Sequence, residues 1–192
     1  MPEPFRSITS RVVVVERDHV DTDQIIPARF LTTTSRDGLG THAFADWRGR
    51  PGCPLDAPGA TDAKILVGGS NFGCGSSREH AVWALLDFGF RVVIAQSFGD
   101  IFRRNALENG LLTVQVGAEV VSAIRSDPEV EVEVDLETCG LQVSGWGSTS
   151  FEVDAFGRHC LLHGVDTLGF LLERKADIQA FERARAEGAA AR

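Results

Sequence analysis

KILVGGSNFGCGSSREHAVWALLDFGFRVVIAQSFGDIFRRNALENGLLTVQV, at residues 64–116, alternates short apolar runs with longer stretches of helical periodicity. The apolar runs at 64–69, 91–96 and 111–116 are rich in Val, Ile and Leu, which is typical of buried strands. Between them, two stretches carry apolar side chains at helical spacing and end at Gly89 and Gly110. This strand–helix order predicts a parallel sheet covered by helices, and therefore an α/β fold.

The segments before this stretch predict one more strand and a long irregular region. Residues 11–15 are β-branched and indicate a buried strand, which leads into a turn-like segment at 18–23. Residues 30–62 are rich in Thr, Gly, Pro and Asp and lack periodicity. An irregular connection of this length is usually functional or a site of family variation.

The segments after it predict further helices and strands. Residues 118–128 indicate a helix, 129–136 alternate strictly as in a half-exposed strand, and 140–156 indicate two strands around a glycine-containing turn. The C-terminal residues 173–192 predict a helix and a tail that frays because its last residues lack apolar periodicity. We therefore expect one domain over residues 1–192.

The composition excludes several classes of protein. The chain has 192 residues, 43% of them hydrophobic, which is enough for one well-packed core. Its 19 Lys and Arg against 27 Asp and Glu give a formal net charge of -8, which disfavours nucleic acid as a partner. No apolar run approaches the roughly 18 residues of a membrane span or forms the core of a signal peptide. We expect a cytoplasmic protein with no membrane association.

The four cysteines do not predict a metal site. They are widely spaced and include no CxxC pair, so we expect reduced thiols and no metal or cofactor bound by this chain: Cys53, Cys74, Cys139 and Cys160. Cys74 lies in a glycine-rich turn, where we interpret it as a small side chain that the turn tolerates rather than as a nucleophile.

The motif NFGCGSSREH at 71–80 carries the most chemical information, because it lies between a predicted strand and a predicted helix. Gly73 and Gly75 permit a sharp turn and bring the backbone close to a ligand. Backbone N–H groups at a helix start attract anions. Two hydroxyls and a planar guanidinium that suits a carboxylate follow at Ser76, Ser77 and Arg78. The motif therefore indicates an anion-binding turn.

The turn has three other possible interpretations. The spacing also fits a capping box, in which Ser76 caps the helix and Glu79 reaches back, and this role is compatible with anion binding. A dinucleotide fingerprint fails because Arg78 replaces its third glycine and the next strand ends in Gln96 rather than an acid. A hydrolase elbow fails because Phe72 stands where its last glycine is needed.

Residues 71–98 resemble the signature of the small subunit of 3-isopropylmalate dehydratase, which is similar to the swivelling C-terminal domain of aconitase. Three further stretches agree in the family's order: DTDQIIPARFL at 21–31, HAFADWR at 42–48 and DAFGRHCLLHGVDTLG at 154–169. The resemblance implies an aconitase-type swivelling β/β/α domain, built as a sandwich or a partial barrel.

The resemblance also implies an activity and a partner. The family's enzyme is a hydro-lyase that isomerises 2-isopropylmalate to 3-isopropylmalate through 2-isopropylmaleate in leucine biosynthesis. A large subunit carries a [4Fe–4S] cluster whose open iron binds the substrate, and the small subunit supplies the base. We therefore expect this chain to bind a 2-alkylmalate and to be active only with its large subunit.

The resemblance assigns roles to four polar residues. Ser76 matches the serine whose alkoxide abstracts and returns the carbon-bound proton, and Ser77 and Arg78 match residues that hold a substrate carboxylate. Because a serine hydroxyl is a weak acid, neighbouring N–H groups and Arg78 must stabilise its anion. Asp23 resembles an active-site aspartate that orients the catalytic serine; an Asx turn is its other interpretation.

The region 30–62 corresponds to the family loop that selects the substrate's variable group. Leu31 and Thr32, beside Phe30 and the further threonines 33 and 34, suit an alkyl group, so we expect Leu31 and Thr32 to contact the substrate. Arg36 has two interpretations: it could fold inward, or it could be a solvated loop arginine.

Two alternative functions stay open. Gly68–Ser70 and Val82 depart from the family's usual pattern, which would fit a related small subunit that acts on citraconate, dimethylmaleate or another 2-alkylmalate. A non-catalytic anion-binding or regulatory module is the other alternative. His80 is interpreted as a structural residue, and the pair His159 and His163 has no third metal ligand nearby.

Overall fold

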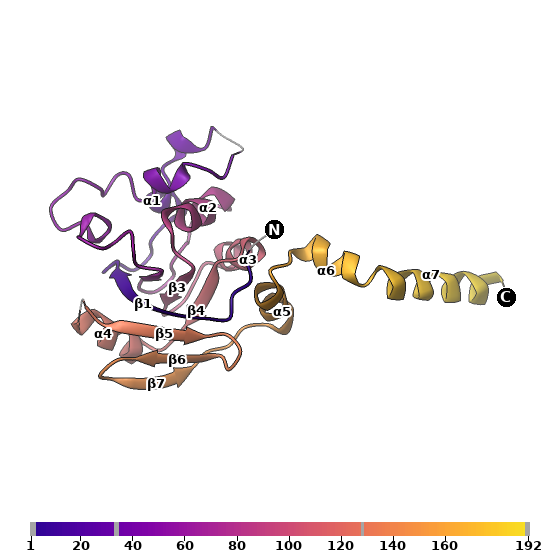
Figure 1. Cartoon of the computed structure of the whole chain (residues 1–192). Helices are drawn as coiled ribbons and strands as arrows, with labels where there is room; N and C mark the ends of the chain where they lie inside the picture. Colours follow the sequence, from indigo (N-terminus) through magenta and orange to yellow (C-terminus); the bar gives the residue numbers. More distant parts are fainter. Residues whose placement is uncertain (1–2, 33–34, 128, 191–192) are drawn as a thin grey trace.

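Three parallel strands and two covering helices form the centre of the computed structural model, which describes residues 3–32, 35–127 and 129–190. Strands β2, β3 and β4 pair in parallel and alternate with helices α2 and α3, which confirms the predicted βαβαβ order (Figure 1). The bounds are Ile65–Val67 for β2, Glu79–Phe88 for α2, Val92–Ala95 for β3, Asp100–Asn109 for α3 and Leu112–Gln115 for β4.

Strand β1, Ser7–Val14, joins this parallel part to an antiparallel part. Its Val12–Val14 end pairs in parallel with β2, and its Ser7–Arg11 end pairs antiparallel with β5. The sheet order is β4-β3-β2-β1-β5-β6-β7, with β5 at Glu131–Asp135, β6 at Gly140–Val143 and β7 at Gly147–Ser150. The antiparallel strands turn away from the parallel ones, so the single sheet curls into a half-barrel (Figure 1). The partial-barrel form of the expected fold is therefore the one observed.

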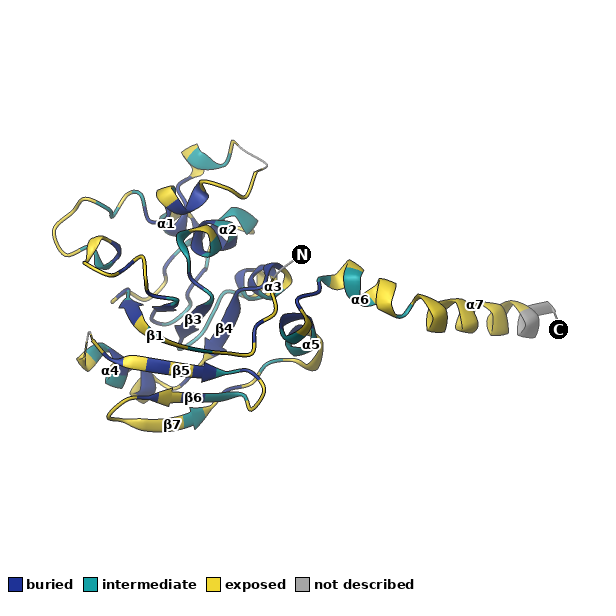
Figure 2. Ribbon diagram, in the orientation of Figure 1, coloured by how far each residue is buried: buried dark blue, intermediate teal, exposed yellow. Residues whose placement is uncertain are grey.

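The parallel strands are buried on both faces. Neighbouring residues of a strand point to opposite sides of the sheet, so they belong to two different core clusters. Val13, Leu66 and Val93 belong to a core cluster that also contains the buried faces of α2 and α3. Val12, Ile65 and Val92 belong to a second cluster shared with α4, at Ala118–Ser126, and with the antiparallel strands. Figure 2 shows the buried residues on both sides of the strands.

The irregular region predicted at 30–62 packs against α2. It follows the short helix α1, Thr22–Ile25, and among the described residues of this part of the chain the regular elements are 3-10 helices at Ala28–Phe30, Leu39–His42 and Pro54–Asp56, with no strand. Gly40 is pressed against the end of α2: its N–H donates to Asp87 Oδ2 at 2.7 Å, and an added Cβ would overlap the backbone there. The region is therefore fixed to α2 although it has no sheet partner.

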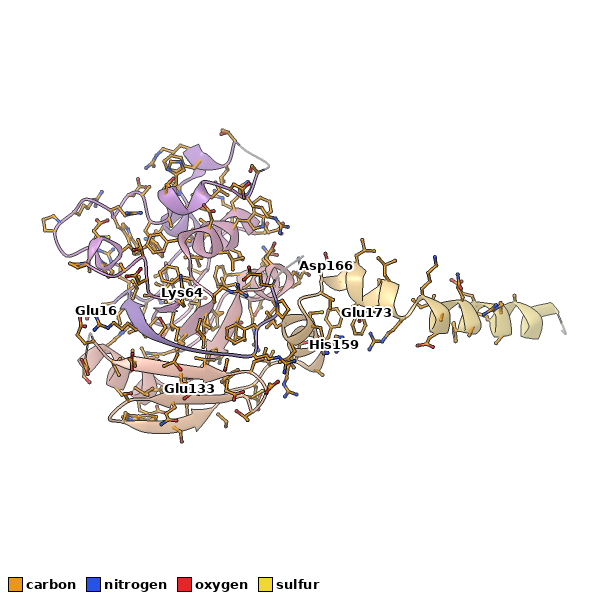
Figure 3. All side chains as sticks on the ribbon, in the orientation of Figure 1. Glu16, Lys64, Glu133, His159, Asp166 and Glu173 are labelled. Atoms are coloured by element: carbon orange, nitrogen blue, oxygen red, sulfur yellow. The ribbon has the colours of Figure 1, made fainter. Side chains whose placement is uncertain are left out.

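The C-terminal residues form an arm that extends away from the sheet. Helix α5, Ala155–His163, packs on the body, and α6, Thr167–Glu173, and α7, Lys175–Ala190, lead outward (Figure 1). His159 lies close to Glu173 at the base of this arm, with 3.7 Å between Nε2 and Oε2 (Figure 3). In the described part of the chain, no helix has both the length and the apolar character needed to cross a membrane.

Two leucines in different helices test this description of the core. Leu85 in α2 is 0% exposed and Leu168 in α6 is 63% exposed. Leu85→Ala should lower the free energy of unfolding by about 2–5 kcal/mol because it leaves a cavity, whereas Leu168→Ala should change it by about 0.5 kcal/mol or less. Urea titration of each purified variant followed by circular dichroism measures both values, and equal losses would contradict the burial of α2.

Candidate active site

The glycine turn after β2 lies between the segments that follow β1 and β3. The Gly73 N–H donates to Val20 O at 2.8 Å, and the Thr22 N–H donates to Cys74 O at 2.9 Å. On the other side, the Phe72 N–H donates to Ser97 O at 2.9 Å. These bonds continue the parallel pairing beyond the strands and hold residues from three distant parts of the sequence side by side.

At two positions in this turn, both the backbone conformation and the surrounding atoms favour glycine over any residue with a side chain. Gly73 and Gly75 have φ of +72° and +88°, in the left-handed region that disfavours a Cβ. A Cβ at Gly73 would overlap the ring of Phe102, and one at Gly75 would overlap the carboxylate of Asp21. The turn therefore closes tightly on α3 at one end and on the start of α1 at the other.

Asp21 begins α1 as its N-cap. Its side chain accepts the N–H of Asp23 at 2.7 Å, and its own N–H donates to Gln24 Oε1 at 2.9 Å, which completes a capping box. The Asx-type contact that we considered for Asp23 is therefore made by Asp21. This leaves the Asp23 carboxylate available for another partner.

The predicted site residues come together at the mouth of this turn. Asp23 forms an ion pair with Arg78, which joins α1 to the segment before α2. Ser76 and Ser77 are exposed next to that pair. In the described part of the chain, the backbone N–H groups of Gly75, Ser76 and Ser77 donate to no backbone carbonyl. Free N–H groups, hydroxyls and a guanidinium thus converge where a carboxylate could bind.

The capping-box interpretation of Ser76 is wrong. Helix α2 begins only at Glu79, its N-cap is Arg78, and no side chain caps it. Ser76 O accepts hydrogen bonds from the Arg78 N–H at 2.8 Å and from the Thr22 hydroxyl at 3.1 Å, so it is not available to a helix. Glu79 turns toward α3 instead and accepts from Asn109 Nδ2 at 2.8 Å.

The contact between Thr22 and Ser76 was not predicted. The Thr22 hydroxyl lies 3.5 Å from Ser76 Oγ. The sequence signal was weak, because a threonine between two aspartates is typical of an exposed turn. Its burial depends on the turn after β2 folding over it, and that contact spans two distant segments.

The loop residues predicted to contact substrate, Leu31 and Thr32, directly follow the 3-10 helix Ala28–Phe30. Leu31 is half-buried against the core cluster, and Thr32 is exposed. Phe30 stacks on His42 with 3.9 Å between ring centroids. Arg36 is exposed, and its guanidinium carbon lies over the ring of Trp83 in α2, 5.1 Å from the ring centroid. Thr33 and Thr34 lie outside the described residues.

One thiol, that of Cys74, lies within the turn. Burial, together with the Asp21 carboxylate, raises the pKa of Cys74, which favours the neutral thiol. His159 and His163 stack on each other at the base of the arm, far along the chain from the turn. Among the described residues, no three His, Cys, Asp or Glu side chains are grouped as metal ligands.

The turn is open to solvent rather than enclosed. A groove of about 560 Å³ lies elsewhere, between β1 and the 47–63 segment, and residues 71–78 do not line it. Size therefore does not identify the site here. The convergence of Ser76, Ser77, Arg78 and Asp23 makes this turn the candidate site, and three of these residues, Asp23, Ser76 and Ser77, are exposed there.

Comparisons with known proteins agree on one family. Residues 3–119 match the family model of the aconitase C-terminal domain. The 3-isopropylmalate dehydratase small subunit of Anaeromyxobacter dehalogenans is 50% identical over 189 residues, 95% of this chain and 99% of that protein. The one of Herpetosiphon aurantiacus is 46% identical over 188 residues, 96% and 95% of the two chains. The crystal structure of 3-isopropylmalate dehydratase from Methanocaldococcus jannaschii matches with a TM-score of 0.71 at 31% identity, covering 92% of this chain and 99% of that one.

Two glycines with similar backbone angles test how tightly the turn is packed. Gly73 and Gly145 have φ of +72° and +74°, but only Gly73 has atoms within reach of an added Cβ. Gly145→Ala should cost about 1–2 kcal/mol of unfolding free energy for the left-handed backbone. Gly73→Ala should cost about 1–3 kcal/mol more, because its methyl group meets Phe102. Equal losses in urea titrations would show that the turn is looser than described.

Proposed function

The chain belongs to the aconitase C-terminal domain family, among the small subunits of 3-isopropylmalate dehydratase, and from this membership we propose that it serves as such a subunit. The proposed reaction is the isomerisation of 2-isopropylmalate to 3-isopropylmalate through 2-isopropylmaleate, in leucine biosynthesis. The observation that carries the proposal is the turn that presents Ser76 and Arg78 together at the carboxyl ends of the parallel strands.

Ser76 is the proposed base. Its alkoxide takes the carbon-bound proton of the substrate as hydroxide leaves the neighbouring carbon. In the addition step, hydroxide adds to the carbon that lost the proton, and Ser76 returns the proton to the carbon that lost the hydroxyl group. A free serine does not ionise near neutral pH, so the anion needs nearby donors. The N–H groups of Gly75, Ser76 and Ser77 and the guanidinium of Arg78 are the donors at hand.

Arg78 and Ser77 are proposed to hold a substrate carboxylate. A guanidinium presents two parallel N–H groups, a geometry that matches a carboxylate better than a point charge does. Asp23 pairs with Arg78 in the structure, so it would fix the guanidinium in place rather than touch Ser76 directly. A substrate carboxylate would then join an arginine that is already oriented.

A large subunit is the proposed partner, and it would carry the [4Fe–4S] cluster. The residues of this chain do not fit a cluster. Its four cysteines are free thiols, and among the described residues no three His, Cys, Asp or Glu side chains are grouped as metal ligands. The exposed position of Ser76 and Ser77 supports a site whose remaining walls belong to that partner. We propose the cytoplasm as the location, and the excess of 27 acidic over 19 basic residues supports no nucleic-acid partner.

One experiment separates this function from a non-catalytic role. The chain is purified alone, and with the co-expressed large subunit of its own organism, and hydration of 2-isopropylmaleate is followed anaerobically. Activity only in the mixture supports the proposal. An assembled complex with an intact cluster but no activity on 2-isopropylmaleate, citraconate or dimethylmaleate would support the anion-binding or regulatory alternative.

Replacement of the proposed base should abolish turnover without unfolding the chain. Ser76→Ala should lower kcat of the assembled enzyme by at least about a hundredfold, because the proton acceptor is lost. Stability should be almost unchanged, because Ser76 is exposed and caps no helix. Ser144→Ala, at an exposed position in the turn between β6 and β7, serves as the control and should keep full activity. Substantial turnover by the Ser76 variant would remove the proposed role.

Substrate choice tests the proposed contact of Leu31 and Thr32. Each methyl group buried on binding contributes about 0.8 kcal/mol, so the two carbons that separate isopropylmalate from citramalate should give roughly tenfold discrimination. Leu31→Arg and Thr32→Arg should weaken isopropylmalate and favour a substrate with an additional carboxylate, because only that substrate pairs with the new charge. Values of kcat/KM that stay equal to wild type for both substrates would place this loop away from the variable group.

A further inference from the structure

Thr22 is a buried polar residue whose hydroxyl is directed at Ser76. Its exposed fraction is 1%, so its hydroxyl is shielded from water. It donates to the main-chain carbonyl O of Ser76 at 3.1 Å, and it lies 3.5 Å from both Ser76 Oγ and Asp21 Oδ1. A buried hydroxyl costs free energy unless it has a partner, and here that partner is the main chain of the residue proposed as the base.

The backbone of Thr22 is held in place by a hydrogen bond to the glycine turn and by its position at the start of α1. The Thr22 N–H donates to Cys74 O at 2.9 Å, and Thr22 is the first residue of α1, directly after the N-cap Asp21. A β-branched side chain on a fixed backbone has few rotamers available. The hydroxyl therefore has few positions open to it, and in the observed one it lies beside Ser76 Oγ.

A hydroxyl suits both protonation states of Ser76, because it has one donor and two acceptor positions. While Ser76 is neutral, the Thr22 hydroxyl donates its hydrogen bond to the main-chain carbonyl O of Ser76. A lone pair of the Thr22 oxygen can then accept a hydrogen bond from the Ser76 hydroxyl. When Ser76 is an alkoxide, the Thr22 O–H can rotate toward Oγ and donate to it. No proton leaves Thr22 in either state. The nearby carboxylate of Asp23 cannot do this as an anion, since it only accepts, and it is paired with Arg78.

We propose that Thr22 is a positioning residue that holds Ser76 Oγ in place and donates a hydrogen bond to its alkoxide. This inference rests on the proposed role of Ser76 as the base. It assigns to the neutral threonine the orienting role that the resemblance placed on Asp23. The contact with substrate is left to Ser77 and Arg78, so Thr22 should affect proton transfer more than substrate binding.

Substitutions of Thr22 in the assembled enzyme test the proposal. Thr22→Val keeps the shape and removes the hydroxyl, and it should lower kcat by about ten- to hundredfold while KM changes less than about twofold. The acid limb of the kcat profile should move to higher pH, because the alkoxide loses a donor and the pKa of Ser76 rises. Thr22→Ser restores the hydroxyl and should recover most of kcat.

Thr113 provides a matched control. It is another buried threonine, 3% exposed in β4, and its hydroxyl has no hydrogen-bond partner in the described structure. Thr113→Val should leave kcat, KM and the pH profile unchanged. A loss of kcat in Thr22→Val that Thr22→Ser does not rescue, or that comes with an equal rise in KM, would overturn the positioning role and indicate a structural one.

The outcomes also separate this inference from the proposed function. If Ser76→Ala is inactive and Thr22→Val is fully active, the function stands and the role of Thr22 is wrong. If Ser76→Ala keeps its turnover, the proposed base is wrong, and any effect of Thr22→Val must have another cause. Thermal unfolding of each complex identifies a variant that fails to fold. If Thr22→Val fails, Thr22→Ala, which also lacks the hydroxyl, takes its place in the comparison with Thr22→Ser.

Discussion

Backbone hydrogen bonds beyond the ends of the parallel strands are the constraint on which the site depends. The segment after β2 pairs with the segment after β1 through Gly73 and Thr22, and with the segment after β3 through Phe72. Main-chain groups make these contacts, so they fix the turn whatever the exposed side chains are. Gly73 and Gly75 are required because the turn closes against Phe102 and Asp21. Only within this frame can Ser76 and Arg78 face a ligand from one side.

The curled sheet explains why these segments meet. Strand β1 pairs in parallel with β2 at one end and antiparallel with β5 at the other, so it is the one strand shared by both parts. Parallel strands deliver their carboxyl ends to the same edge, where open α/β sheets usually bind ligands. The antiparallel part supplies the second core and the support for α4, and it contributes no residue to the turn. The antiparallel part of the sheet thus contributes to the core, and the parallel part carries the candidate site.

The strands and helices of the parallel part could be predicted because their periodicity is local. The start of α2 could not, since Ser76 is withdrawn from the helix by Thr22, which is distant in the sequence. The role of Thr22 and the pairing of Asp23 with Arg78 could not be predicted for the same reason, because the partners are far apart in the sequence. The family resemblance located Ser76, Ser77, Arg78 and Asp23 together, and their proposed roles rest on that resemblance. Arg36 was uncertain because its position depends on Trp83, on the face of a helix whose packing the sequence does not specify.

The irregular region at 30–62 has a consequence for how this family can diversify. Its described residues pair with no strand, and they are fastened at separate points, such as the Gly40 N–H on Asp87 and the Phe44 N–H on Ile25 O. The proposed base, by contrast, is held by main-chain bonds of the glycine turn. Connecting loops tolerate changes in sequence and length better than the elements they connect. A lineage can therefore inherit changes in this one segment while it keeps the turn that carries the proposed base.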